Sequence, residues 1–266
     1  MSRAARILPP LLFVAVVIGL WEVYVDAGGA SSFVLPAPHA VAASLWSNAG
    51  LIAGNLAVTA EEVGLGLALA LVLGFALAVA IHLSPVLRRA VYPWAVGSQA
   101  VPIAVIAPLL VYWWGFGVLP KLFVIVLICF FPVVVTTVDA FAAVDPDQLK
   151  LLRTLDATRW QSLRFAELPA ALPAALSGAR IALAVGVIGA YIAESETPTY
   201  VGSNSGLGYE INSDLNLSAL TQTPRAWAGT VVLFVFAIAC FYALGVVQRR
   251  IAPWAAHGGH RAGATA

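Results

Sequence analysis

The sequence predicts an all-α polytopic membrane protein with about six transmembrane helices. Of its 266 residues, 61% are hydrophobic and only 10% are charged, whereas a soluble domain usually carries about 25% charged residues. One span needs roughly 20 apolar residues to cross the hydrocarbon core, so the chain has room for six spans joined by short loops. The net charge of +1 favours neither a nucleic acid nor an acidic partner.

Six apolar stretches are long enough to cross a membrane. The expected spans cover residues 7–26, 57–83, 91–114, 119–143, 171–194 and 226–249. A cleaved signal peptide also begins with basic residues before an apolar run, as this chain does with Arg3 and Arg6. Because the following chain is itself strongly apolar, an uncleaved first span is the better interpretation.

The basic residues divide unevenly between the two sides of these spans. One side has only Lys121 and Arg225, and Arg180 lies within the fifth span. Eleven residues fall on the other side: Arg3, Arg6, Arg88, Arg89, Lys150, Arg153, Arg159, Arg164, Arg249, Arg250 and Arg261. Positive charge marks the cytoplasmic side. We therefore expect a multi-pass protein of the bacterial plasma membrane with both termini in the cytoplasm.

Residues 1–266 are expected to form a single transmembrane domain with its core at 57–249. Outside the spans, residues 31–48 suggest an extended stretch followed by a short amphipathic helix on the membrane surface. Residues 195–222 are polar and glycine-rich, which indicates an exposed loop. The tail at about 255–266 is predicted to be disordered.

The cytoplasmic loop at residues 145–169 begins with a helix signal. Asp145 is a suitable N-cap and Pro146 suits the first helical position. The residues that follow provide an apolar stripe at spacings of three: Leu149, Leu152 and Leu155. The pattern predicts a short amphipathic helix.

The same loop carries a second capping signal, in which Thr158 is followed three residues later by Gln161. A second helix should begin there and end before Pro169, after a turn at Asp156–Ala157. Loops in compact proteins are typically about 4 to 6 residues long. A long, capped and amphipathic pair of helices therefore indicates a surface that docks a partner.

The segment from Leu151 to Trp160, continuing through Phe165 to Pro173, resembles the coupling loop of binding-protein-dependent ABC importer permeases, often called the EAA motif. Further similarity is found at Ser177–Arg180, Ala193–Glu194, Gly206–Tyr209 and Thr223–Pro224. The resemblance implies the type I ABC importer permease fold and a coupling helix pair seated in a groove on an ATP-hydrolysing subunit. The residues it assigns to coupling are Leu152, Arg153, Leu155, Asp156, Ala157, Thr158, Arg159 and Trp160. One departure is Asp156, where the family usually has glycine; Asp tolerates turn conformations.

The family resemblance implies a separate ATPase, and the sequence agrees. A P-loop needs a glycine-rich turn followed by Lys and Ser or Thr, but the two lysines, Lys121 and Lys150, are each followed by leucine. We therefore expect no enzymatic site, no catalytic or metal-binding residues and no cofactor in this chain. ATP and Mg are expected on the ATPase dimer. The other expected partners are an extracytoplasmic solute-binding protein, a second copy of the permease, and membrane lipid.

Within the superfamily, the chain is most similar to the nitrate, sulfonate, taurine and thiamine-precursor group. Residues 129–137 resemble permeases for hydroxymethylpyrimidine-type thiamine precursors or riboflavin. Aromatic side chains suit a planar heterocycle, because stacking contributes about 0.5 to 1.5 kcal/mol beyond burial. The alternative role for each ring is to pack between helices or to lie in an aromatic belt at the membrane–water interface. The candidate pathway and gate residues are Tyr112, Trp113, Trp114, Phe130, Phe131 and Glu194.

Two alternatives to this function remain open. One is a nitrate-, sulfonate- or taurine-type ABC permease. The other is a proton-coupled secondary transporter, which would need coupling groups near the membrane middle and usually an internal repeat; the acids here lie near span ends instead. Among those acids, Asp139 is expected to pair with Arg180 near the inner face.

Overall fold

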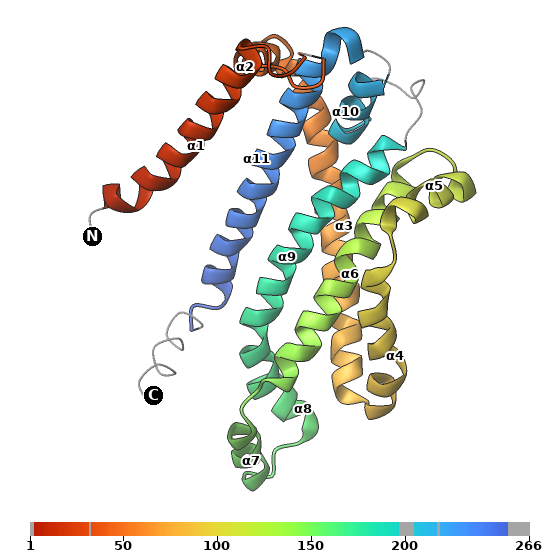
Figure 1. The fold of residues 1–266 in the computed structure, drawn as a ribbon. Helices are drawn as coiled ribbons and strands as arrows, with labels where there is room; N and C mark the ends of the chain where they lie inside the picture. Colours follow the sequence, from red (N-terminus) through yellow and green to blue (C-terminus); the bar gives the residue numbers. More distant parts are fainter. Residues whose placement is uncertain (1–2, 32, 197–204, 217–218, 255–266) are drawn as a thin grey trace. The chain divides into compact units, whose positions relative to one another are not determined.

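The structure is a computed structural model that describes residues 3–31, 33–196, 205–216 and 219–254 (Figure 1). Within these ranges all regular secondary structure is helical. The helices are α1 Arg3–Asp26, α2 Pro38–Ser47, α3 Ala49–Leu83, α4 Pro85–Gly97, η1 Ser98–Ala100, α5 Ile103–Trp114, α6 Val118–Ala142, α7 Pro146–Thr154, α8 Arg159–Ser162, η2 Leu163–Glu167, α9 Leu168–Ser195, α10 Leu207–Asn216 and α11 Ala219–Ile251. The predicted all-α class is confirmed.

Four helical segments of the described chain are long and apolar enough to cross a membrane: Ala49–Leu83, Val118–Ala142, Arg159–Ser195 and Gln222–Ile251. They coincide with the second, fourth, fifth and sixth expected spans. Helix α1 covers the first expected span as a helix of 24 residues. The expected disordered tail at 255–266 lies outside the described residues.

The third expected span, residues 91–114, is not one straight helix. It consists of two helical segments, Pro85–Ala100 and Ile103–Trp114, that are bent by 98° at the break between them. The cause is Pro102, which has no N–H and disfavours the α conformation of the residue before it. Val101 is accordingly extended, with φ −74° and ψ 122°.

The chain divides into two compact units, with boundaries within α3, after α9 and within α11. The first unit comprises residues 1–59 and 197–234, and the second comprises residues 60–196 and 235–266. The second unit contains the predicted coupling loop and most of the expected spans.

Close packing of α6 against α9 forms the centre of the second unit, where Figure 1 shows the two helices side by side. Glycines on α9 face side chains of α6: a Cβ added to Gly178 would lie 2.7 Å from the Cβ of Thr136, and one added to Gly186 would lie 2.6 Å from the Sγ of Cys129. Small residues permit this approach where no hydrophobic drive operates between helices. Cys129 is buried at this contact, and its thiol donates to the carbonyl of Ala182 at 3.1 Å.

In the first unit, α10 corrects one expectation. The segment 195–222 was expected to be an exposed loop, but its described part contains the 10-residue helix α10. Leu207, Ile211 and Asp214 of this helix are buried. The reason is partly ionic: Arg225 of α11 donates from Nε to Asp214 at 2.7 Å, which allows a polar sequence to be buried. Residues 197–204 lie outside the described residues.

Candidate functional site

Helix α7 opens the loop between α6 and α9 as its capping signal predicts. The Asp145 carboxylate accepts a hydrogen bond from the N–H of Asp147 at 2.9 Å, and Pro146 occupies the first turn. The cap satisfies an N–H that has no partner within the helix. Lys150 pairs with Asp147 at 2.7 Å on the exposed side of the helix.

The turn after α7 is built on Asp156, at the predicted position. Its φ is +54°, a left-handed conformation that is uncommon for residues other than glycine. The N–H of Ala157 donates to the carbonyl of Leu152 at 3.0 Å, and that of Asp156 donates to Arg153 at 3.1 Å. These two bonds define a Schellman motif. Asp is one of the few residues that adopt this conformation at small cost, so the turn forms without the usual glycine.

The second loop helix begins with the predicted capping box. The N–H of Gln161 donates to the Thr158 hydroxyl, and the N–H of Thr158 donates to the Gln161 side chain at 2.7 Å. The expected end before Pro169, however, is wrong. Helix α8 continues through the π turn η2 into α9. Pro169 directly follows the π turn and its next residue, and the wider π turn avoids the clash that proline causes inside an α-helix.

The loop exposes large apolar side chains. Leu155 and Trp160, both predicted coupling residues, are 70% and 63% exposed, and Leu151 and Phe165 are 62% and 67% exposed. Leu151 and Phe165 were not among the residues assigned to coupling. Leu152, which was assigned, is instead half-buried. Four large apolar groups on one short loop are unusual for a surface that contacts only water and indicate a protein or membrane contact.

A polar cluster anchors this loop to the end of α3. The buried carboxylate of Glu167 in η2 pairs with Nε2 of His82, and Arg159 donates to the His82 carbonyl at 3.4 Å. The His82 ring also stacks on Phe141 of α6, with centroids 4.5 Å apart. None of these contacts was predicted. The signal in the sequence was a histidine at the end of an apolar span and an acid within the capped loop.

A second buried ionic group lies at the opposite ends of the same helices. Lys121 of α6 donates to Glu62 of α3 at 2.9 Å, and both side chains are buried. Glu194 of α9, the predicted gate residue, is fully buried and is a neighbour of Glu62. Charged groups within membrane helices are costly and are usually kept for a function. The group therefore ties three helices together where the gate was expected.

The aromatic pathway candidates do not converge on one place. Tyr112 and Trp113 are 85% and 66% exposed at the end of α5, and Trp114 packs edge-on against Phe123 at 5.0 Å. Phe130 and Phe131 contact each other in a T-shaped arrangement at 5.1 Å. Of the six candidates, Phe131 alone lines the cavity described next.

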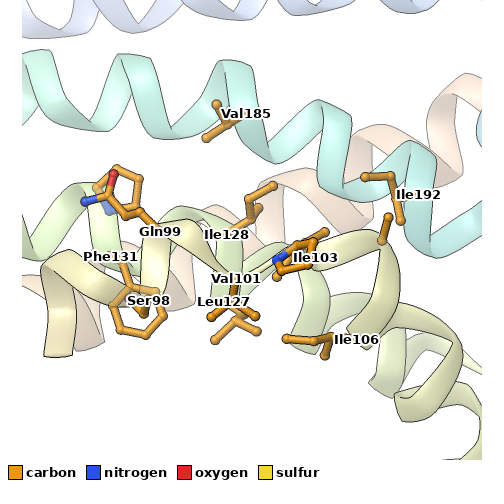
Figure 2. A pocket seen from close by; sticks show the side chains of 13 residues that line it. Ser98, Gln99, Val101, Ile103, Ile106, Leu127, Ile128, Phe131, Val185 and Ile192 are labelled. Atoms are coloured by element: carbon orange, nitrogen blue, oxygen red, sulfur yellow. The ribbon is translucent and has the colours of Figure 1, made fainter.

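A cavity of about 530 Å³ lies between the α4–α5 bend, α6 and α9 (Figure 2). Its lining is almost entirely apolar, with Phe131, Ile128 and Val185 among the contributing side chains. The polar side chains that line it, Ser98 and Gln99, both come from η1 at the bend. Because Pro102 creates the bend, the break in the expected third span also creates this cavity.

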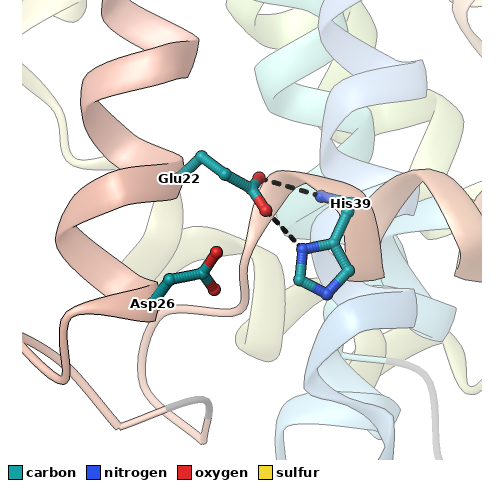
Figure 3. A group of neighbouring side chains, drawn as sticks. All are labelled: Glu22, Asp26 and His39. Carbon is teal, nitrogen blue, oxygen red and sulfur yellow. Dashed lines mark hydrogen bonds and ion pairs between the residues drawn. The ribbon is translucent and has the colours of Figure 1, made fainter.

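One group of side chains in the first unit has the composition of a metal site. Glu22 and Asp26 of α1 and His39 of α2 place their ligand atoms within 4.8 Å of one another (Figure 3). The His39 backbone N–H also donates to Glu22 at 3.2 Å, and its ring pairs with the same carboxylate. The hydrogen bond to Glu22 raises the pKa of His39. An ion pair between α1 and α2 accounts for these contacts without a metal.

The first unit also contains a buried carboxylate network that was not predicted. Arg225 binds Asp214 through both nitrogens of its fork and lies 3.7 Å from Glu210. Asn55 of α3 donates to Glu210. Burial raises the pKa of Glu210. The network fixes α10 against the beginnings of α3 and α11.

The expected pair of Asp139 and Arg180 does not form, although both residues belong to the second unit. Asp139 accepts from the hydroxyl of Tyr92 at 2.8 Å. Arg180 lies over the ring of Phe241 at 4.1 Å and donates to the carbonyl of the same residue. The two side chains face different helices, α4 and α11, which the sequence spacing does not reveal.

Comparison with known proteins agrees with this architecture. Residues 70–253 match the family model of the binding-protein-dependent transport system inner membrane component. A probable ABC transporter permease protein of Haemophilus influenzae is 34% identical, and the alignment covers 92% of this chain and 97% of that protein. The formylaminopyrimidine transport permease protein ThiX of Halalkalibacterium halodurans is 32% identical over 96% and 98% of the two chains. The riboflavin transport system permease protein RibX of Chloroflexus aurantiacus is 33% identical, and the alignment covers 89% of this chain and 86% of that protein.

Solved structures show the same fold at low sequence identity. An inward-facing structure of the MetNI methionine ABC transporter aligns with a TM-score of 0.62 at 16% identity, covering 78% of this chain and 97% of that chain. An amino acid ABC transporter crystallised with histidines aligns with a TM-score of 0.60 at 17% identity, with the same coverage. The fold is therefore that of the type I ABC importer permeases, as expected from the loop.

Proposed function

The chain belongs to the family of binding-protein-dependent transport system inner membrane components, the permeases of ABC importers, and on this premise we propose that it imports a planar nitrogen heterocycle of the thiamine-precursor pyrimidine type. Three further parts belong to the proposal. A separate ATPase docks on the α7–α8 loop, a binding protein delivers the solute from outside, and both termini lie in the cytoplasm.

The docking role of the loop is carried by its exposed apolar side chains. Burying a Leu or Phe side chain fully is worth about 1.5 to 3 kcal/mol, and Leu155, Trp160 and Phe165 are each more than three-fifths exposed. A partner that covers them would gain several kcal/mol before the cost of association. The anchor through Glu167 and His82 supports a mechanical role, because it ties the docking segment to the end of a membrane helix.

The choice of a heterocycle rests on two observations. Both ThiX and RibX, permeases named for heterocyclic solutes, are more than 30% identical to this chain, while the taurine permease TauC of Escherichia coli is 30% identical and the aliphatic sulfonate permease SsuC of Bacillus subtilis is 28% identical. The cavity at the α4–α5 bend has Phe131 and Gln99 in its lining but no Lys or Arg among the described residues. A sulfonate or nitrate would favour a cationic lining, whereas a flat ring with hydrogen-bonding edges suits an aromatic and an amide.

A homodimer completes the proposed importer. One chain has too few spans to enclose a path, and two-fold symmetry is the usual solution for identical subunits.

Substrate binding to the partner protein tests this assignment. The solute-binding protein proposed to serve this permease is purified and titrated calorimetrically with formylaminopyrimidine, riboflavin, taurine and nitrate. Formylaminopyrimidine is expected to bind most tightly, with riboflavin next. Exclusive binding of taurine or another sulfonate would support the sulfonate-type alternative and reject the heterocycle.

Co-purification tests the energy source independently of the solute. A tagged permease extracted in mild detergent is expected to retain a nucleotide-binding subunit. A permease that never retains one, and whose transport follows the proton gradient, would instead be a secondary transporter.

A further inference from the structure

A polar pocket of about 220 Å³ lies within the coupling loop, between α7 and the α8–η2 segment. Its lining combines two arginines and one acid with three uncharged residues: Arg153, Arg159, Glu167, Leu149, Ala157 and Ser162. The Schellman turn at Asp156 makes this geometry possible, because it reverses the chain and brings Arg153 of α7 and Arg159 of α8 to the same pocket.

The two guanidinium groups have unused binding capacity. Each carries five N–H donors. Within the described part of the chain, neither Arg153 nor Arg159 forms an ion pair. The one hydrogen bond that these two arginines form there is the 3.4 Å contact from Arg159 to the His82 carbonyl. The acid in the lining, Glu167, is already paired with His82. The pocket therefore presents two guanidinium groups whose positive charge is not neutralised by an acid within the loop.

Lys150, a neighbouring basic residue, differs from the two arginines in being paired and outside the pocket. Lys150 lies three residues before Arg153 on the same helix and carries the same charge. Its ammonium pairs with Asp147 at 2.7 Å, and it does not line the pocket. An exposed pair of this kind contributes little to binding, so Lys150 provides a matched control for charge without pocket geometry.

We propose that this pocket binds the carboxylate of an Asp or Glu side chain on the surface of the ATPase subunit. The inference rests on the proposed function, because it names the chemistry by which the partner recognises the loop. Two guanidinium forks around one carboxylate can form bidentate, charge-assisted hydrogen bonds, which are stronger and more directional than ordinary ones. The exposed Leu155 and Trp160 of the same loop would supply apolar contact, while the pocket fixes the register of docking.

The test measures affinity between the purified permease in lipid nanodiscs and its purified ATPase subunit, without any transported solute. The variants are Arg153→Glu and Arg159→Glu, with Lys150→Glu as the control. We expect each arginine reversal to weaken binding at least tenfold, and the control to change it less than twofold. Raising the salt concentration should weaken wild-type binding more steeply than binding of the reversed variants.

Two controls separate a lost contact with the ATPase from a misfolded loop: a check that each variant remains folded, and a compensating charge reversal on the ATPase. Thermal unfolding of each variant shows whether the loop remains folded, and Arg153→Gln removes the charge without introducing a new one. Reversal of the facing ATPase acid to lysine, located by cross-linking from the loop, should restore binding to Arg153→Glu. Wild-type affinity in Arg153→Glu and Arg159→Glu would overturn the proposal.

Two other outcomes are distinguishable. If the arginine variants lose binding to phosphatidylglycerol vesicles but keep full ATPase affinity, the pocket recognises a lipid headgroup, and the proposal is wrong. If the wild-type permease binds no ATPase at all, the proposed function fails as well. Failure of the inference alone leaves the wild-type complex intact.

Discussion

Replacing Gly178 with alanine tests the helix packing on which the second unit is built. Gly178 lies on α9 where it crosses α6. An added Cβ would lie 1.9 Å from the Oγ1 of Thr136 and 2.7 Å from its Cβ, whereas ordinary contact begins at 3.4 Å. The hydroxyl contact is therefore about 1.5 Å too short.

The expected loss of folding stability follows from the groups that must move to make room for the added methyl group. Rotating Thr136 would remove the hydrogen bond from its hydroxyl to the carbonyl of Pro132 at 2.7 Å, which is worth about 1 kcal/mol. Rotation cannot move the Thr136 Cβ, so α9 must also shift, and such overpacking costs about 1 to 3 kcal/mol. Alanine recovers about 0.5 to 1 kcal/mol through its helix propensity. We expect a net destabilisation of about 1 to 3 kcal/mol.

The assay is reversible unfolding of the purified permease in mixed micelles with increasing SDS, followed by circular dichroism. The control is Gly64→Ala, because a Cβ at Gly64 on α3 meets no atom within 4 Å; this variant should be neutral or up to about 1 kcal/mol more stable. The double variant Gly178→Ala with Thr136→Ala should recover part of the loss. Equal stabilisation of Gly178→Ala and Gly64→Ala would refute the close approach of α6 and α9.

Three further predictions concern the polar features. Lys121→Met leaves the buried Glu62 without its cation and should destabilise the protein by about 3 to 5 kcal/mol in the same assay; adding Glu62→Gln should restore most of it, and a neutral single variant would show that the pair is not buried. Asp156→Gly should stabilise the loop turn by up to about 1 kcal/mol and Asp156→Val should destabilise it, because a β-branched residue disfavours φ +54°; hydrogen exchange of the Ala157 amide reports both, and slower exchange in the valine variant would contradict the turn. The pKa of His39 should lie above the usual value of 6.5, so the α1–α2 ion pair should be fully present below that pH and be lost as pH rises through the raised pKa; an NMR titration of His39 checks this, and the shift should disappear in Glu22→Gln.

Local signals in the sequence predicted the loop well. The caps at Asp145 and Thr158 and the turn at Asp156 depend on hydrogen bonds between residues two to five positions apart. Such contacts are visible in sequence because the chemistry and the spacing lie together. The apolar length of the spans is equally local, since it reflects the thickness of the membrane.

Features that depend on contacts between distant segments were missed or misjudged. The Glu62–Lys121 pair joins residues far apart in the chain, and Arg180 binds Phe241 rather than the expected Asp139. The effects of two prolines were also mispredicted. The helix continues past Pro169 by way of a π turn, whereas the expected third span is broken into two segments at Pro102. The apolar length from which the spans were predicted does not distinguish these two outcomes.

Transport in a reconstituted system tests the central claim, which is ATP-driven import through a separate ATPase that docks on the α7–α8 loop. Proteoliposomes containing the permease, its ATPase and its binding protein are supplied with radiolabelled formylaminopyrimidine, with ATP accessible to the ATPase. Transport should require ATP, stop with vanadate, persist with a protonophore, and fall sharply when Leu155 and Trp160 are replaced by alanine. Transport that continues without ATP hydrolysis and collapses with the protonophore would contradict the account.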